Sequence, residues 1–206
     1  MSVAPELAEP AVDVAFALEG VSLPRDHAQA LAEALAAHLP WLAGHPTAAV
    51  HPVKLVPGGE PVAWLSQRAR LLLRVPQARE AELAALAGRT LGVGGSTLRL
   101  GAPKSHALLP HGTLYAYFVA AADDDEAAFM RSVDADLAAL GIGCRTVCGK
   151  RQEKGTASAM LVGFSLMLHG LNAADSLTVQ CLGLGPHRGL GCGVFVPHKS
   201  AAAVGS

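Results

Sequence analysis

Charged and aromatic residues are scarce in this chain of 206 residues. Only 16% of the residues are charged and 4% are aromatic, whereas 51% are apolar. A sequence this apolar can bury a large core, and it is not expected to be disordered. So few aromatic side chains also argue against a nucleic-acid surface that depends mainly on base stacking. The length is compatible with one large domain or two small ones.

Cysteine is also sparse, and its spacing does not favour a metal centre. Cys144 and Cys148 are separated by three residues rather than two, and no histidine pair with the spacing of a zinc site follows them. Four cysteines are what a reduced cytoplasmic protein with small buried thiols would contain. We therefore expect neither a metal nor a cofactor.

Two kinds of hydrophobic segment are missing. The N-terminus lacks the charged start, apolar stretch and cleavage site of a signal peptide. No apolar run reaches the roughly 18 residues that a membrane helix requires. We expect a cytoplasmic protein with no membrane partner.

The net charge of -1 hides an uneven distribution of charged residues. Residues 66–104 contain seven Lys or Arg and two acidic residues, and residues 145–206 contain six and two. By contrast, residues 123–136 contain six acidic residues and one Arg. A polarised surface of this kind binds phosphate backbones, although solvated charges clustered by chance would give the same counts.

Hydrophobic periodicity predicts an alternating order of strands and helices in the first half of the chain. Val12, Val14, Phe16 and Leu18 alternate with smaller or polar residues, which is typical of a strand. Elements are expected in the order strand 12–18, helix 26–38, extended segments 49–56 and 70–75, helix 77–87 and strand 97–100. This is the order β-α-β-β-α-β.

The second half repeats that order. We expect a strand at 114–120, a helix at 124–140, strands at 145–147 and 161–168 around a polar loop at 149–158, a helix at 173–181 capped by Asn172, and a strand at 194–196. Two such units predict an α+β protein of two tandem ferredoxin-like domains, each an antiparallel sheet with helices on one face. The predicted domains are residues 1–105 and 106–206.

The segment 183–193 contains five glycines in eleven residues. Such a segment can turn its backbone N–H groups toward an anion, with His187 and Arg188 as further donors. It follows a helix and precedes a strand, which is the reverse of the dinucleotide-binding and P-loop motifs. A connector that lets a helix and a strand pack closely explains the glycines equally well.

This segment also carries a family resemblance. Gly183-Leu-Gly-x-x-Arg188-x-x-Gly191-Cys-Gly-x-Phe195-x-Pro197, preceded by Leu171-Asn-Ala-Ala-Asp-Ser176, resembles the C-terminal signature of the CRISPR repeat-processing endoribonucleases of the RAMP superfamily. Residues 66–76, 98–101 and 148–151 extend the similarity, which is strongest to the compact MYXAN-subtype branch. The resemblance implies tandem ferredoxin-like domains, metal-independent cleavage of CRISPR repeat RNA (pre-crRNA), and retention with the guide beside other subunits of an interference complex.

Metal-free RNA cleavage uses the 2′-OH beside the scissile phosphate as an internal nucleophile, and it leaves a 2′,3′-cyclic phosphate and a 5′-hydroxyl. Histidine suits the proton transfers because its free pKa of about 6.5 is near the working pH. The resemblance implies a catalytic histidine in the first domain, on or shortly after the first helix. His51 and His27 are the preferred candidates, with His38 and His45 as third choices. The alternative for His51 and His27 is an ordinary helix, strand or turn residue.

Basic residues supply candidate contacts to RNA phosphates. Arg68, Arg70 and Arg74 alternate along a predicted strand approach and should share one face. Lys150, Arg151 and Lys154 fall in the predicted polar loop, and either Lys104 or Lys150 is a candidate to stabilise charge during cleavage. In the glycine segment, the candidate RNA-binding residues are Gly185, His187, Arg188, Gly189 and Gly191.

Two other functions are compatible with the sequence. A non-catalytic RNA-binding subunit of a CRISPR effector complex would need the same glycine segment and basic faces but no catalytic histidine. An unrelated ferredoxin-like scaffold or metabolic protein would explain the slightly acidic pI. Salt-sensitive binding to repeat RNA would exclude the scaffold, since phosphate contacts weaken as salt rises.

Overall fold

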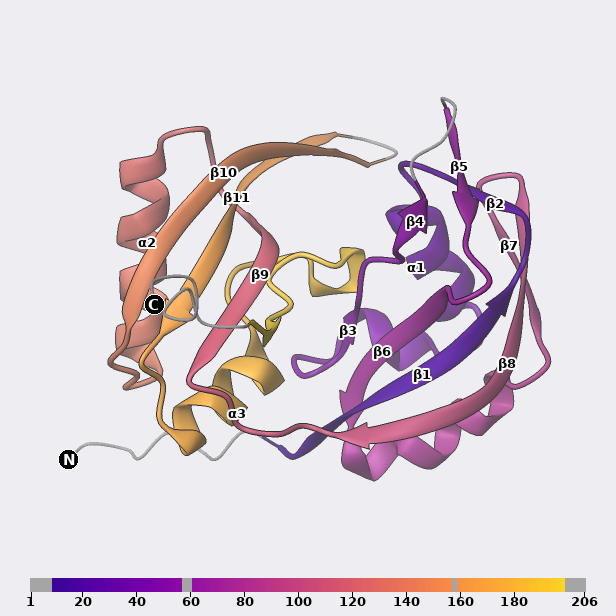
Figure 1. The fold of residues 1–206 in the computed structure, drawn as a ribbon, viewed down its shortest axis with the longest axis horizontal. Coiled ribbons are helices and arrows are strands. Elements are labelled where there is room, and N and C mark those ends of the chain that lie inside the picture. The colour runs from indigo at the N-terminus through magenta and orange to yellow at the C-terminus, as the bar shows by residue number, and fades with distance from the viewer. Residues whose placement is uncertain (1–8, 57–60, 157–158, 199–206) are drawn as a thin grey trace, which may run out of the picture.

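A computed structural model describes residues 9–56, 61–156 and 159–198. The chain forms two larger sheets side by side, with a small third sheet at one end (Figure 1). No helix in the described part of the chain is both long and apolar enough to cross a membrane.

The first sheet comes from the N-terminal half of the chain. Its strands are β1 (Ala11–Glu19), β3 (Ala49–Val50), β6 (Arg70–Pro76), β7 (Thr90–Val93) and β8 (Ser96–Ala107), in the order β3-β6-β1-β8-β7. β1 lies between β6 and β8 and is antiparallel to both. The helix α1 (Ala28–Ala36) and the 3₁₀ segments η1 (Pro40–Ala43) and η2 (Gln77–Leu86) complete this unit. The alternation that predicted the first strand buries Val14 and Phe16, which are 1% and 0% exposed.

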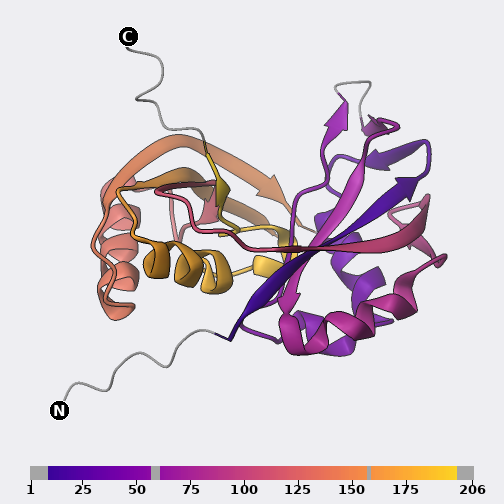
Figure 2. The same ribbon diagram turned by 60° about the horizontal axis from the view of Figure 1, so that its bottom comes forward.

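The second sheet comes from the C-terminal half. Its strands are β9 (Thr113–Ala120), β10 (Arg145–Gly155), β11 (Met160–His169) and β12 (Val196–Pro197), in the order β10-β11-β9-β12. The helices α2 (Glu126–Ala139) and α3 (Ala173–Leu182) lie on one side of it (Figure 2). Both larger sheets therefore place their first strand between the third and the fourth of the repeated β-α-β-β-α-β order, which is the ferredoxin-like arrangement.

Each sheet has its own apolar core. One buried cluster runs from Val12 to Leu100 in sequence and the other from Leu114 to Phe195. The predicted division after residue 105 falls inside β8, whose last residue, Ala107, still pairs with Val12. The chain thus passes from one core to the other in the short segment between β8 and β9.

Several local predictions are confirmed. α2 and α3 lie within about two residues of the predicted bounds. Asn172 caps α3 as expected, because its side-chain oxygen accepts a hydrogen bond from the backbone N–H of Asp175 at 2.8 Å.

Several predicted elements differ from the structure. The extended segment 49–56 contains two short strands of different sheets, and the strand expected at 97–100 runs from Ser96 to Ala107. The segment 77–87 is a 3₁₀ run rather than an α-helix. The predicted polar loop at 149–158 is wrong over most of its length, since β10 continues to Gly155 and residues 157–158 lie outside the described part. Lys150, Arg151 and Lys154 therefore lie on a strand. Lys150 and Arg151 are exposed on the sheet surface, whereas Lys154 is partly buried.

A small sheet was not predicted. It consists of β2 (Ser22–Pro24), β4 (Leu55–Val56) and β5 (Val62–Leu65), with β5 in the middle. Its strands are only two to four residues long. Segments this short show no clear alternation of apolar residues, which is why the pattern did not reveal them.

Candidate active site

The glycine segment 183–193 lies between the two larger sheets (Figure 1). Its 3₁₀ turn η3 (Arg188–Leu190) packs against β3 and α1 of the N-terminal unit. Gly191 has a φ of +81°, and a Cβ there would lie 3.1 Å from the carbonyl oxygen of Val50. A glycine is therefore required at this point, both for the left-handed backbone and for the close approach to β3.

A cavity of about 150 Å³ lies where these elements meet. The residues around it come from both halves of the chain: Arg25, His27, Ala28, Leu31, Val50, His51, Pro52, Lys154, Gly189 and Leu190. It therefore brings together both predicted catalytic histidines, one of the predicted RNA-binding lysines and the glycine segment. Residues far apart in the sequence form one site.

His27 lies immediately before α1 and is 8% exposed. Its Nδ1 lies 2.8 Å from the carbonyl oxygen of Pro24. A carbonyl only accepts hydrogen bonds, so Nδ1 carries the proton of the neutral ring and Nε2 keeps a free lone pair. Burial lowers the pKa of His27, and the positive charge of Lys154 acts in the same direction. Near neutral pH the ring is thus an uncharged base.

Lys154 reaches the cavity from the other unit. It lies near the end of β10, and its Nζ donates a hydrogen bond to the carbonyl oxygen of Leu190 in η3. Burial lowers the pKa of the ammonium group. The neighbouring Gly155 packs closely against Asp26, since a Cβ there would lie 3.2 Å from that carboxylate. The hairpin of β10 and β11 thereby delivers the lysine to the start of α1.

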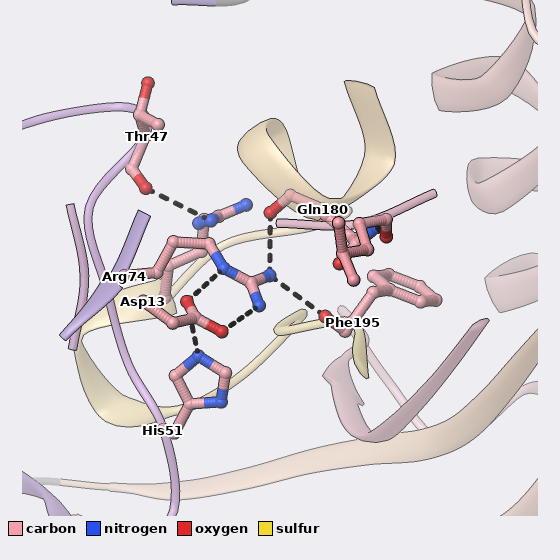
Figure 3. A network of polar contacts seen from close by, with 8 residues as sticks. Asp13, Thr47, His51, Arg74, Gln180 and Phe195 are labelled. Carbon is pink, nitrogen blue, oxygen red and sulfur yellow. Dashed lines mark hydrogen bonds and ion pairs between the residues drawn. The ribbon is translucent and has the colours of Figure 1, made fainter. Parts of the chain in front are cut away.

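His51 also lines the cavity, but it is held differently. It is 7% exposed, and its Nε2 lies 3.4 Å from Asp13 Oδ1 (Figure 3). That separation is at the long limit of a hydrogen bond, and Nε2 has no closer polar partner among the described residues. Burial lowers the pKa of His51, although Asp13 opposes the shift. The imidazole is therefore neutral and oriented by a carboxylate.

Arg74 is the centre of the polar network in Figure 3. Its Nε and Nη2 donate to the two carboxylate oxygens of Asp13 at 2.7 and 2.9 Å. Its Nη1 donates across the interface to the carbonyl oxygens of Gln180 at 2.8 Å and Phe195 at 2.9 Å. The guanidinium joins the two units, and each of its three nitrogen atoms donates at least one hydrogen bond.

The charge of Asp13 reflects these contacts. Burial alone would raise the pKa of its carboxyl group, but the contacts with His51 and Arg74 outweigh burial and hold the pKa far below its usual range. Asp13 is therefore ionised near neutral pH. It is the only acidic partner that Arg74 has within the described residues.

Arg188 lies near Arg74, but fewer of its guanidinium nitrogens have hydrogen-bond partners. Its Nη2 donates to the carbonyl oxygen of Thr47 at 3.3 Å, but its buried Nε and Nη1 have no hydrogen-bond partner in the described part of the chain. Burial lowers the pKa of this guanidinium to about 10, and the charge of Arg74 adds to the shift. Both carboxylate oxygens of Asp13 bond to Arg74, and no carboxylate contacts Arg188 within the described residues.

Arg68, Arg70 and Arg74 do not form the exposed stripe that the sequence predicted. Arg74 is 1% exposed, because the C-terminal unit covers that face of β6. Arg70 is exposed at the start of β6, and Arg68 is exposed in the turn before it. Only these two of the three remain accessible to a phosphate.

The other predicted RNA-binding residues lie outside the cavity. Lys104 is exposed on β8, and Lys150 and Arg151 are exposed on β10. Arg151 contacts Glu153 at 3.0 Å and Asp124 at 3.6 Å. Neither Lys104 nor Lys150, the two lysines expected to stabilise charge, lines the cavity; Lys154 does.

Residues of the glycine segment divide between surface and interior. Gly185 and His187 are exposed, and His187 adopts a left-handed backbone with a φ of 67°. Gly189 lines the cavity, and Gly191 packs against β3. This segment is thus a packing element on one side and a wall of the site on the other.

Sequence reasoning missed Asp13 and the structural role of Arg74. Each is a charged residue in the interior of its strand, between apolar neighbours, and the other charged residue of that strand stands at its end. Such a residue is rarely buried without a partner, so the two isolated charges could have been read as a pair. Their separation of 61 residues gave no local signal that they meet.

Comparisons with known proteins agree with one another. A family model described as "Cas6 Crispr" matches residues 12–200. The "CRISPR-associated endonuclease Cas6" of Myxococcus xanthus (strain DK1622) is 38% identical over 196 residues, which cover 95% of this chain and 85% of that protein.

Solved structures resemble the fold. One described as "CRISPR associated protein Cas6" superposes with a TM-score of 0.67 at 11% identity, covering 93% of this chain and all of its own. Thermus thermophilus Cse3, solved "bound to an RNA representing a pre-cleavage complex", gives 0.52 at 14% identity, covering 91% of this chain and 98% of its own. At these identities the likeness concerns the fold, and the predicted tandem ferredoxin-like architecture is confirmed.

Proposed function

This chain belongs to the Cas6 family of CRISPR-associated endoribonucleases, which process CRISPR RNA, and on that premise we propose that it cuts repeat RNA in the cavity between its two ferredoxin-like units. The observation that supports this location is the juxtaposition of His27 and Lys154. They come from different units, and both line a cavity walled by the glycine segment.

His27 is the general base of the proposed reaction. With Nδ1 bonded to Pro24, its free Nε2 takes the proton of the 2′-OH as that oxygen forms a bond to phosphorus. The lowered pKa keeps the ring unprotonated near neutral pH and ready to accept the proton. The bond from phosphorus to the 5′ oxygen then breaks, which leaves a 2′,3′-cyclic phosphate.

Lys154 supplies the positive charge. Its ammonium group lies where it can offset the negative charge that develops on the phosphorane oxygens. Its lowered pKa also makes it a better proton donor to the departing 5′ oxygen, which becomes a hydroxyl. The proton held by His27 then returns to solvent and Lys154 takes one up from solvent, so the protons balance without a metal ion.

His51 is assigned a positioning role. Its neighbour Pro52 packs against Gly191, and its imidazole is tied to the Asp13–Arg74 pair. It therefore holds β3 against the glycine segment rather than taking the proton itself. With Nε2 turned toward Asp13, His51 could exchange a proton with the 2′-OH only through Nδ1.

Two further features complete the proposal. Exposed Arg68, Arg70, Lys104, Lys150 and Arg151 bind the phosphates of the repeat RNA outside the cavity. The cleaved guide then stays bound, so that the protein joins the other subunits of an interference complex, as the family resemblance implies.

Single-turnover cleavage of repeat RNA in EDTA tests the assignment. His27→Ala should reduce the cleavage rate by about 10²- to 10⁴-fold, and Lys154→Ala by roughly 10²- to 10³-fold, with little change in RNA affinity for the histidine variant. His38→Ala is the matched control, since it removes an exposed histidine at the other end of α1. A 2′-deoxy nucleotide at the cut should block cleavage but not binding.

The same assay separates the alternatives. Full activity in His27→Ala with loss in His51→Ala would move the catalytic role to His51. Tight binding of intact RNA by the unaltered protein would identify a non-catalytic RNA-binding subunit. Cleavage of the 2′-deoxy substrate, or inhibition by EDTA, would refute the proposed chemistry.

A further inference from the structure

A second, larger hollow adjoins the cleavage cavity. Its volume is about 370 Å³, and Leu190 of η3 is part of both walls. The lining comes from α1, η1, the β10–β11 hairpin and the glycine segment: Gln29, Ala32, Glu33, Ala36, Ala43, Thr156, Ala159, Leu161, His187 and Leu190. We call it the alanine pocket after four of these residues.

Its position follows from the geometry of α1. His27, Ala28 and Leu31 line the cleavage cavity, whereas Gln29, Ala32, Glu33 and Ala36 line the alanine pocket on the adjacent face of the same helix. An RNA strand that has its scissile phosphate beside His27 and continues along this face of α1 would meet the pocket within a few nucleotides. A volume above 300 Å³ is in the range of small-ligand sites.

The charge of the pocket argues for a base rather than a phosphate. Glu33 is its one carboxylate, and no lysine or arginine is among the lining residues. A carboxylate repels a phosphate but accepts hydrogen bonds from the N–H groups of a base. The alanines form small, flat walls against which a planar ring can stack.

Glu33 is also oriented. Gln29 Nε2 donates to Glu33 Oε1 at 3.0 Å, one helical turn away. That contact holds the carboxylate on the side of α1 that faces the pocket, and it leaves further lone pairs free to accept.

We propose that the alanine pocket binds the guanine base of a nucleotide close to the scissile phosphate and that Glu33 reads it. Guanine presents two adjacent donors on its pairing edge, N1–H and the N2 amino group, which match the two oxygens of a carboxylate. Adenine and cytosine present one amino donor beside an acceptor, and uracil presents one N–H between two acceptors. The inference rests on the proposed function, because the role of the pocket follows from its position beside the proposed cleavage cavity.

The test is single-turnover cleavage of a repeat RNA pool randomised over four nucleotides on each side of the cut, with the products read by sequencing. The unaltered protein should favour guanine at one of these positions by roughly 5- to 150-fold, the range expected of one bidentate contact. Glu33→Gln and Glu33→Ala should abolish that preference and leave the preferences at other positions unchanged.

Inosine at the position where guanine is preferred tests the contribution of the N2 amino group alone. Inosine keeps N1–H but lacks the N2 amino group, so the unaltered protein should cut it more slowly than guanosine, while Glu33→Ala should cut the two at equal rates. Ala36→Leu, which fills the pocket, should lower the cleavage rate of the substrate with guanosine at that position. It should not lower the rate for a substrate with an abasic site at the same position. Glu82→Gln is the control, since Glu82 is an exposed carboxylate on η2.

The outcomes distinguish this inference from the proposed function. If the pool is cut with no preference for guanine near the scissile phosphate, or if the preference survives in Glu33→Ala, the assignment of the pocket is wrong and the cleavage mechanism stands. If no RNA in the pool is cut, the proposed function itself fails.

Discussion

The polar residues between the two units are not equally well satisfied. Arg74 makes four hydrogen bonds, two of them to Asp13. Arg188, which is close enough for the charge of Arg74 to lower its pKa, has one long hydrogen bond and two buried nitrogens without partners. A buried donor that loses water without gaining a partner destabilises the fold. The two arginines should therefore respond in opposite ways to the same substitution.

Arg188→Met should stabilise the protein. The methionine side chain fills similar space without burying an unpaired charge, and such replacements are often neutral or stabilising. We expect a gain of about 1 kcal/mol in the free energy of unfolding, which corresponds to about 2–4 °C in Tm for a chain of this size. Thermal unfolding followed by circular dichroism measures it.

Arg74→Met is the matched control for that experiment. It leaves His51 as the one polar side chain beside the Asp13 carboxylate. It also removes the two hydrogen bonds that Arg74 makes across the interface. The expected loss is about 3–5 kcal/mol. A loss of Tm in Arg188→Met as large as that in Arg74→Met would show that Arg188 is a necessary part of the network.

At the scale of elements, the glycine segment and the β10–β11 hairpin assemble the site from opposite directions. The segment requires a left-handed backbone at Gly191 where it meets β3. The hairpin extends beyond its own core and carries Lys154 to the start of α1. Both elements line the cavity because they pack against the N-terminal unit.

Gly191→Ala should destabilise the interface between the units. The left-handed φ strains any residue with a Cβ, and that Cβ would meet Val50 and Pro52 at 3.1 Å. We expect a cost of about 1–3 kcal/mol in the free energy of unfolding. Gly189→Ala is the control two residues away, because a Cβ at that position has no neighbour within 4 Å. Urea titration compares the two, and equal stabilities would refute the packing role of Gly191.

At the scale of the whole molecule, two buried histidines make stability depend on pH. Burial lowers the pKa values of His27 and His51 below their unfolded value of about 6.5. Between the folded and the unfolded pKa, the unfolded chain binds more protons than the folded one. Stability therefore rises with pH in that window, and it is lost as the pH falls below about 6.5.

Urea unfolding from pH 8 to pH 5 should show this loss. The lowered pKa of Asp13 acts only at lower pH, because its contribution is complete above its unfolded value of about 3.9 and is lost as the pH falls through its folded value. His27→Gln should flatten part of the slope between pH 7 and pH 5, and the control His38→Gln should leave it unchanged. A protein whose stability is constant over that range would contradict the burial of both rings in neutral form.

The sequence by itself determined the order of the elements and the fold. Alternating apolar residues, helix caps and glycine stops are local signals, and β-α-β-β-α-β repeated twice admits few arrangements. The glycine segment was likewise visible from its composition, although whether it packed or bound an anion stayed open. The bounds of α2 and α3 followed because their caps act within a few residues.

Only the tertiary structure separated the two histidines and selected the lysine. His27 and His51 look alike in sequence, and they differ through partners on other elements: Pro24 for one ring and Asp13 for the other. Lys154 could not be preferred to Lys150 or Lys104, because its proposed role depends on a hairpin that packs against the other unit. Arg74 was expected on a surface, yet it is buried and donates hydrogen bonds to carbonyl oxygens 106 and 121 residues away. Burial and charge pairing are set by contacts between distant segments, and no local pattern encodes them.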